Sequence, residues 1–406
     1  MQNFTGYEYI KIDIANHFGL DKELFEPRIK WVDKNHKKLE SLMDKADEPF
    51  LYMAGVLALR EAEAHKPTGH MIGFDACASG MQILAVLSGC PLTAALTGLI
   101  NPNERADAYS KIVVAMNKLL PKELQIGLNV DGLTRADVKL AVMTYFYGSE
   151  QEPKNAFKEG SLAYQVFFQV LHELAPGAEQ LRNLFIGIWP KGATENSWHL
   201  PDGLNARVRV MVDKETKIEV DELGGATFTH YYAVNEGTDK GVALAAHITH
   251  SIDGYLVREI GRRCDYAFMG AELVEALALL NKYLDGRVYQ APDKKYPVSL
   301  AAVHSLNSKT IGNFPLGNLF ALKALINKTM TRSESFEVIS VHDEFKCPPN
   351  NMGTLREVYL EIMQEIADSD LAQTILREIT GRPNAVYKKF TNDLSSQMMN
   401  SNYHIC

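Results

Sequence analysis

The segment from Ala76 to Pro102 carries no charged side chain, and this run constrains the fold more than any other feature. A segment of this length is long enough to cross a bilayer, and otherwise it must be buried in a protein core. It contains several polar residues, and Pro91 stands near its middle. We therefore interpret it as two buried helices broken at residues 89–91 rather than as a membrane span.

The composition supports a core large enough to cover such helices. The chain has 406 residues, of which 46% are hydrophobic, and this suits two or three sub-domains sharing a core. Its net charge of −8 argues against a uniformly basic coat for nucleic acid but not against a local basic channel. The five cysteines form no CxxC pair and the N-terminus lacks a signal-peptide pattern, so we expect a reduced, intracellular protein without structural zinc.

Periodicity predicts an α+β fold that is mostly helical. Apolar residues recur at steps of three and four over 103–120, residues 1–70 look amphipathic, and shorter alternating or apolar runs indicate strands. The expected elements are helices over 1–70, a strand at 71–74, helices at 103–120 and 134–147, a β-hairpin over 207–220 turning at 213–216, a strand at 336–341 and a helical tail from about 353.

One predicted helix carries a mixed stripe of cations and an aromatic ring. Thr134 and Asp137 form a capping pattern for a helix that starts at residue 134. Along it, a residue of the stripe recurs every four positions, which keeps all members near one face. The stripe could bind a polyphosphate and stack on a base, or it could be a solvated face ending in a core tyrosine. Its members are Arg135, Lys139, Met143 and Tyr147.

Two aspartates follow apolar strands. Asp75 comes after MIGF, and Asp343 stands in VISVHDEF. Two carboxylates at strand ends can hold a pair of divalent ions that activate an attacking oxygen and stabilise a leaving one. Alternatively, Asp75 caps a helix and Asp343 is a turn residue. The histidines His247 and His250 could face one side of a helix, but no third metal ligand stands nearby.

Four motifs follow one another in a characteristic order and spacing. They are DACASGMQ at 75–82, Arg-x3-Lys-x7-Tyr-Gly at 135–148, HSIDG at 250–254 and His-Asp at 342–343. WHLPDG at 198–203 accompanies them. Together they resemble the single-subunit RNA polymerases of phages and mitochondria, and the resemblance covers nearly the whole chain apart from about 265–335.

The resemblance implies roles for individual positions. Asp75 and Asp343, with the backbone carbonyl of Ala76, would bind two Mg²⁺ ions. Arg135, Lys139 and Lys22 would contact the triphosphate. Tyr147 would select the ribonucleotide, His250 would lie near its 2′-hydroxyl, and Tyr109 would line the nucleotide pocket. The expected catalytic set is Asp75, Asp343, Lys139, Tyr147 and His250, and the expected substrate-binding set adds Lys22, Arg135, Met143, Gly80 and Tyr109.

Two other functions remain open at this stage. Family A DNA polymerases share the Arg-x3-Lys layout, but they usually carry Glu where Gly80 stands and an aromatic residue where Met143 stands. Gly80 leaves room for a 2′-hydroxyl, so both positions favour RNA synthesis. The other alternative is a catalytically silent scaffold that binds nucleic acid.

The resemblance also implies a division of the chain into the parts of a right-hand polymerase. Residues 1–110 would form the first part of the palm. Residues 111–249 would form the fingers, with the Arg135–Gly148 helix and a hairpin at 207–235. Residues 250–264 and 336–406 would complete the palm and a C-terminal foot, and 265–335 would be an insertion of unknown role.

The family's N-terminal domain and thumb have no counterpart before Asp75. We therefore expect the larger, catalytic subunit of a split podophage RNA polymerase, acting in the host cytoplasm with no membrane association. Its partners would be the DNA template, nascent RNA, NTPs and a second polypeptide. That polypeptide is expected to cover an apolar surface around Tyr7, Tyr9, Ile10 and Phe18.

Overall fold

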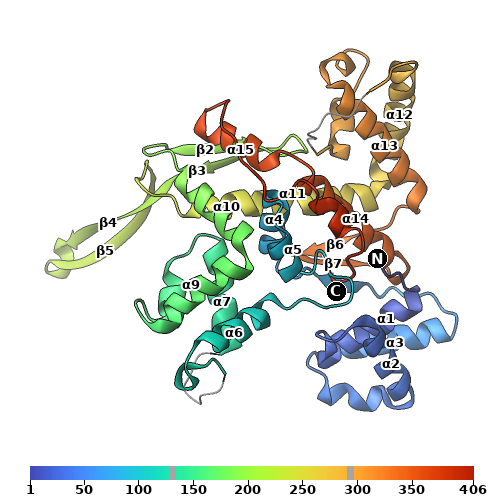
Figure 1. Ribbon diagram of the computed structural model, residues 1–406, viewed down its shortest axis with the longest axis horizontal. Coiled ribbons are helices and arrows are strands. Elements are labelled where there is room, and N and C mark those ends of the chain that lie inside the picture. Colours follow the sequence, from blue (N-terminus) through green and yellow to red (C-terminus); the bar gives the residue numbers. More distant parts are fainter. Residues whose placement is uncertain (128–133, 290–296) are drawn as a thin grey trace.

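The computed structural model describes residues 1–127, 134–289 and 297–406, and it confirms a largely helical α+β chain (Figure 1). The N-terminal part is helical, as predicted. It contains α1 (Gly6–Ala15), α2 (Phe25–Asn35) and α3 (Pro49–Glu63), and α1 packs against both of the others. A capping box between Thr5 and Glu8 begins α1.

A small antiparallel sheet lies at the centre of the fold (Figure 1). Its strand order is β1 (Ile72–Asp75), β7 (Glu344–Cys347) and β6 (Ile339–Val341). Asp75 pairs with Glu344, and β6 turns into β7 through His342 and Asp343. Two strands separated by more than 260 residues in the sequence therefore bring the two candidate carboxylates to the same end of one sheet. The predicted strand at 336–341 is shorter than expected, because only its last three residues pair.

The uncharged run forms two buried helices, as predicted. All ten residues of α4 (Ser79–Ser88) are buried, and Gly89 ends this helix at a φ of +64°. Pro91 then starts α5 (Pro91–Leu96). Helix α4 packs against α10, α11 and α14, and this explains why the run needs no charges. Within the described ranges, no helix is long and apolar enough to cross a membrane.

A second group of helices follows α5. It comprises α6 (Ala108–Leu119), α7 (Arg135–Phe146), α8 (Gln151–Phe157), α9 (Leu162–Leu174) and α10 (Pro176–Gly187). Helix α7 begins at the predicted capping box of Thr134 and Asp137, and it packs against α6 and α8. The helix expected over 103–120 begins later than predicted, where Asp107 caps α6.

The hairpin predicted at 207–220, and the wider range 207–235, are wrong in their boundaries. Strand β2 (Glu195–His199) pairs with β3 (Asn205–Arg209), and β4 (Met211–Val220) pairs with β5 (Ala226–Asn235). Residues 213–216 lie inside β4, because a two-stranded ribbon exposed on both faces tolerates a polar run. The turn lies instead at Gly224 and Gly225, both with positive φ. The β4–β5 hairpin projects from the body (Figure 1).

Residues 265–335, the expected insertion and called the inserted segment below, have a hydrophobic core of their own. Helix α11 (Ala243–Cys264) leads into it, and α12 (Gly270–Leu284) packs against α13 (Leu316–Arg332). Among the described residues, eleven buried side chains form this core, separate from the main one, and they include Leu273, Leu280 and Leu322. The chain then returns to the main core through α14 (Met352–Ala367), α15 (Leu371–Thr380) and α16 (Leu394–Met398). The tail is helical, as predicted.

Short helical turns complete the secondary structure of the described residues. A π-helical turn spans Asn16–Leu20. The 3₁₀ turns are His36–Lys38, Glu40–Lys45, Lys122–Leu124, Asp221–Leu223, Tyr266–Met269, Leu300–Ser305, Ile311–Asn313 and Pro349–Asn351.

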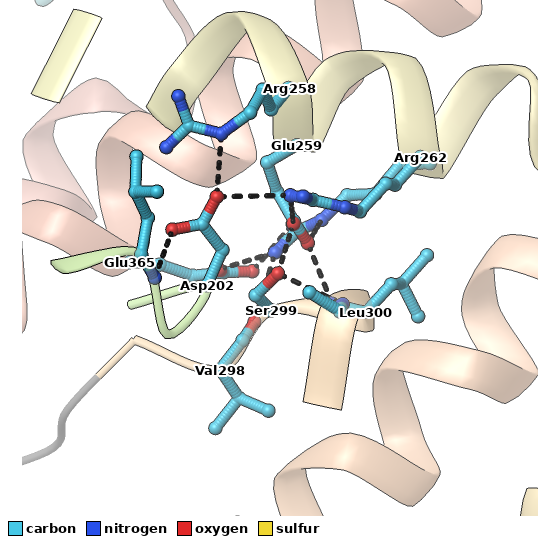
Figure 2. Close-up of polar contacts among 11 residues, drawn as sticks. Asp202, Arg258, Glu259, Arg262, Val298, Ser299, Leu300 and Glu365 are labelled. Carbon is cyan, nitrogen blue, oxygen red and sulfur yellow. Dashed lines mark hydrogen bonds and ion pairs between the residues drawn. The ribbon is translucent and has the colours of Figure 1, made fainter. Parts of the chain in front are cut away.

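A buried polar network joins the inserted segment to the rest of the molecule (Figure 2). Glu259 of α11 is fully buried, and its carboxylate accepts hydrogen bonds from Arg263, from the Ser299 hydroxyl and from the Leu300 N–H. Arg263 also forms a two-pronged ion pair with Glu365 of α14. The same helix surface therefore contacts the inserted segment and α14 at once.

Candidate active site

All eleven residues proposed from the sequence line one cavity of about 470 Å³. The cavity lies between the end of the β1–β7–β6 sheet and helices α4, α6, α7 and α11. The eleven are Lys22, Asp75, Ala76, Gly80, Tyr109, Arg135, Lys139, Met143, Tyr147, His250 and Asp343. Pockets that bind small molecules commonly have volumes of about 300–1,000 Å³, so the space suits a nucleotide-sized ligand.

One wall of the cavity is acidic. Asp75 and Asp343 face it together with Asp253 of α11. The backbone N–H of Ala76 donates to the carbonyl oxygen of Asp343 at 3.1 Å, and this bond holds the two strand ends together. Partial burial and the nearby carboxylates of Asp343 and Glu344 raise the pKa of Asp75 to about 6. Burial and the charge of Asp343 likewise raise the pKa of Asp253 to about 6.

The backbone around these carboxylates is unusual. Ala78 and His342 adopt left-handed conformations, with φ of +63° and +57°, which a side chain with a Cβ disfavours. Ala78, not Asp75, occupies the position before helix α4, so the interpretation of Asp75 as a helix cap is wrong. Asp343 does lie in the two-residue turn between β6 and β7, and the turn directs it to the cavity. Strained backbone of this kind clusters at functional sites.

The C-terminal residues support the Asp75 segment from behind. Ile405 forms an isolated β-bridge with Ala76, and the N–H of Cys406 donates to the carbonyl oxygen of Asp75 at 3.0 Å. Residues 401–406 are all buried. The carbonyl of Ala76, a proposed metal ligand, accepts from the Ala78 N–H at 2.9 Å. A carbonyl oxygen has a second lone pair, so this bond leaves it able to accept once more.

Another part of the cavity wall is cationic. Arg135 and Lys139 of α7 lie over the ring of Tyr109, at 5.7 and 5.8 Å from its centre. Arg135 also donates to the Asp107 carboxylate at 2.6 Å and to the Ser110 hydroxyl at 2.9 Å. The guanidinium is thus held against the start of α6 with its charge near the cavity. The four-residue stripe of α7 lines the cavity along its whole length, as its periodicity predicted.

Lys22 enters the same cavity from the loop before α2. Its ammonium group pairs with the neighbouring Asp21. More than half of its side chain remains exposed, so it can turn toward a ligand.

Tyr147, His250 and Gly80 form a contact set at the end of α7. The Tyr147 and His250 rings meet edge to face, with 4.5 Å between their centres. A Cβ added to Gly80 would lie 2.5 Å from the Tyr147 hydroxyl oxygen. Only glycine therefore lets the phenol occupy this place. Burial lowers the pKa of His250, so its imidazole is neutral at pH 7, and burial raises the pKa of Tyr147 to about 12.

Three further residues of the cavity were not assigned a role from the sequence. Asp253 belongs to the HSIDG motif, so the sequence already indicated that it could lie at the site. Asp107 and Arg105 lie in an irregular segment before α6, where no periodic pattern points to them. Only the folded chain shows that they face the same space.

The acidic wall fits divalent cations bound together with a phosphate substrate. No group of three or more metal-binding side chains occurs among residues 1–127, 134–289 and 297–406. Mg²⁺, however, is usually held by one or two carboxylates together with waters and substrate phosphates. Asp75 and Asp343, with their mutual repulsion and cationic side chains on the same cavity, match that pattern. His247 and His250 lie three residues apart on α11 without a third ligand among the described residues.

Comparison with known proteins places the chain near one group of polymerases. Residues 2–159 match the family model of DNA-dependent RNA polymerase. The DNA-directed RNA polymerase of Pseudomonas phage phiKMV is 28% identical over 301 residues, covering 61% of this chain and 37% of that protein.

More distant matches extend the similarity to mitochondria. The mitochondrial DNA-directed RNA polymerase of Schizosaccharomyces pombe is 28% identical over 163 residues, covering 35% of this chain and 14% of the relative. T7 RNA polymerase of Escherichia phage T7 is 22% identical over 188 residues, covering 36% and 21%. The chain thus has phage and mitochondrial homologues, and it spans well under half the length of these curated relatives.

Proposed function

We propose that this relative of the T7-like single-subunit RNA polymerases is the catalytic chain of a DNA-directed RNA polymerase. The observation that supports this most is the convergence on one cavity of two strand-end carboxylates, two cations of α7 and the Tyr147–His250 pair. A silent scaffold would have no need to keep each of these groups on the same cavity.

The reaction is template-directed nucleotidyl transfer. The 3′-hydroxyl of the growing RNA attacks the α-phosphorus of an NTP, and pyrophosphate leaves. Asp75 and Asp343, with the Ala76 carbonyl, are the groups that would hold Mg²⁺. When bound there, Mg²⁺ lowers the pKa of the attacking hydroxyl and neutralises phosphate charge. Arg135 and Lys139 bind the triphosphate from the cationic part of the wall, so the nucleotide contacts both acidic and cationic surfaces.

Tyr147 and His250 act on the sugar. Their edge-to-face contact places a phenol and a neutral imidazole side by side, and both can hydrogen-bond a 2′-hydroxyl. Gly80 supports this assignment, because any side chain there would displace the Tyr147 hydroxyl. Met143 and Tyr109 line the rest of the nucleotide site.

The proposed polymerase parts follow the fold. Residues 1–110, 250–264 and 336–406 form the palm and foot around the small sheet, and 111–249 form the fingers. The β4–β5 hairpin and the preceding strand β3 contact DNA near the start site, with Arg207 and Arg209 in β3 and Lys214 and Lys217 in β4. Arg207 and Lys214 already pair with Glu195 and Glu236. Arg209 and Lys217 have no ion pair within the described ranges, so they are the better candidates for phosphate contacts.

A second polypeptide would supply the family's missing N-terminal domain and thumb. The surface expected for it needs correction, because Tyr9 and Ile10 are buried and Phe18 is only partly exposed. Apolar side chains are exposed instead on the neighbouring helix α3, where Phe50 is 83% and Leu57 is 56% exposed. We place the partner there, in a heterodimer that acts in the cytoplasm of a host bacterium.

Extension of a preformed RNA–DNA hybrid tests the proposal. The purified chain is given NTPs or dNTPs with Mg²⁺, with and without candidate partner proteins. We expect incorporation of NTPs in preference to dNTPs, and longer products when the partner is present. Preferential use of dNTPs would identify a DNA polymerase, and no incorporation under any condition would favour the scaffold.

A further inference from the structure

Arg105 faces the candidate active site with its hydrogen-bonding capacity largely unused. It lines the cavity from the segment before α6, and only 13% of its side chain is exposed. Among the described residues, its nearest carboxylate is that of Asp21, 4.0 Å away, and its one hydrogen bond, to the Ala106 carbonyl oxygen, is long at 3.4 Å. Its Nε is buried without any partner in the described residues.

A neighbouring arginine shows what a structural role looks like in this region. Arg28 is fully buried, and it donates to the side chain of Asn16 and to the carbonyl oxygens of Asp21 and Glu23. Arg105, with the same chemistry, makes none of these contacts. Five buried side-chain atoms lack a partner in the described residues, and Arg105 Nε is the one in a residue that lines the cavity.

We propose that Arg105 binds the phosphate tail of the incoming nucleotide and the pyrophosphate formed from it. This inference rests on the proposed function. A guanidinium presents planar, paired N–H donors that match the oxygens of a phosphate. Burying these donors without hydrogen-bond partners costs free energy, and a bound phosphate removes that cost. Arg105 and Lys22 then bind the tail from the side of α2, while Arg135 and Lys139 bind it from α7.

The carboxylates near Arg105 are consistent with this role. Asp21 is paired with Lys22, and Asp107 is paired with Arg135, so each already has a cation other than Arg105. The thiols of Cys406 and Cys77 also interact electrostatically with Arg105, but no ion pair closer than 4.0 Å holds its guanidinium among the described residues.

Calorimetric binding of three probes to the full chain tests the inference. The probes are ATP, pyrophosphate and AMP, each with Mg²⁺. For Arg105→Gln we expect roughly tenfold weaker binding of ATP and pyrophosphate, as for loss of a charge-assisted hydrogen bond, and little change for AMP. Arg105→Lys keeps the positive charge but not the paired N–H donors, so this variant should lose less affinity for ATP and pyrophosphate. Arg287→Gln, an exposed arginine outside the cavity, is the matched control and should change nothing.

The outcomes separate this inference from the proposed function. Unchanged pyrophosphate affinity in a folded Arg105→Gln variant would overturn the role of Arg105, even if the wild-type chain makes RNA. Weakened pyrophosphate binding in a chain that makes no RNA would support Arg105 and overturn the polymerase. Equal losses for ATP and AMP would mean that Arg105 acts only on the shape of the cavity. If Arg105→Gln does not fold, the comparison rests on Arg105→Lys, and wild-type affinity there would count against the inference.

Discussion

Replacing Glu259 by alanine should destabilise the junction between α11 and the inserted segment. The Glu259 carboxylate accepts from Arg263 Nε at 3.0 Å, from the Leu300 N–H at 3.0 Å and from the Ser299 hydroxyl. All three donors are buried. Removing the Glu259 carboxylate therefore takes away their hydrogen-bond acceptor, and water cannot replace it (Figure 2). Arg263 keeps its ion pair with Glu365, and this pair limits the loss of stability at the Arg263 side chain.

The magnitude follows from the burial. Breaking one side of a buried charged pair costs about 3–5 kcal/mol, and each unsatisfied buried donor costs about 1–3 kcal/mol. Because Arg263 retains one carboxylate, we expect a total loss of about 3–5 kcal/mol in the free energy of unfolding. Urea denaturation followed by circular dichroism measures this loss. Limited proteolysis should show faster cleavage within residues 265–335.

Glu272→Ala provides the matched control within the same segment. Glu272 pairs with His304, and about half of each side chain is exposed. Exposed pairs contribute about 0–1 kcal/mol, so this variant should remain near wild type. The reasoning is refuted if Glu259→Ala lowers the free energy of unfolding by less than about 1 kcal/mol, because the network would then contribute no more to stability than a surface ion pair.

Four further predictions concern the cavity and the hairpin. Because the pKa of Asp253 is about 6 when folded and near 3.8 when unfolded, its ionised form destabilises the metal-free protein above pH 6, and the penalty disappears as the pH falls toward 4. Asp253→Asn should therefore raise Tm clearly more at pH 7.5 than at pH 4, as measured by scanning calorimetry. Tyr147→Phe should lower the NTP/dNTP ratio of kcat/KM by about 2- to 100-fold while leaving extension with NTPs nearly unchanged, and an unaltered ratio would remove Tyr147 as the sugar sensor. Gly80→Ala should lower the same ratio by displacing the Tyr147 hydroxyl, which steady-state kinetics with both substrates would detect. Arg209→Gln in β3 combined with Lys217→Gln in β4 should reduce the salt dependence of DNA binding by about two ionic contacts, and an unchanged slope would exclude both strands from the DNA interface.

The elements that sequence reasoning placed well have strong local signals. The capping box at Thr134, the four-residue period of α7 and the Gly89–Pro91 break between α4 and α5 are each decided within a few residues. Local rules of this kind survive folding, because the partners that satisfy them are neighbours in the sequence.

The β-structure was harder to predict because its pairing is decided at long range. The polar run in β4 resembles a turn when read alone, and only pairing with β5 makes it a strand. Tyr9 and Ile10 were expected on a surface that the missing polymerase parts would leave uncovered, but both are buried, and the Tyr9 ring packs against Phe74 of the distant strand β1. Arg105 and Asp107 reach the cavity through an irregular segment that has no pattern to follow.

The candidate site itself could be assembled from motif order, and the structure brings those residues to one cavity. What the sequence did not provide is the supporting layer, in which Ile405 bridges Ala76 and Asp107 holds Arg135. These contacts join segments far apart in the chain.

Single-turnover extension of an RNA–DNA hybrid by Asp343→Asn tests the central claim most directly. The wild-type chain and the variant are given one NTP with Mg²⁺, and circular dichroism confirms that both are folded. If Asp75 and Asp343 hold the ions of a polymerase site, losing one ligand charge should slow nucleotide addition by roughly a thousandfold or more. Addition by the folded variant at near the wild-type rate would contradict the assignment of this cavity as the site of RNA synthesis.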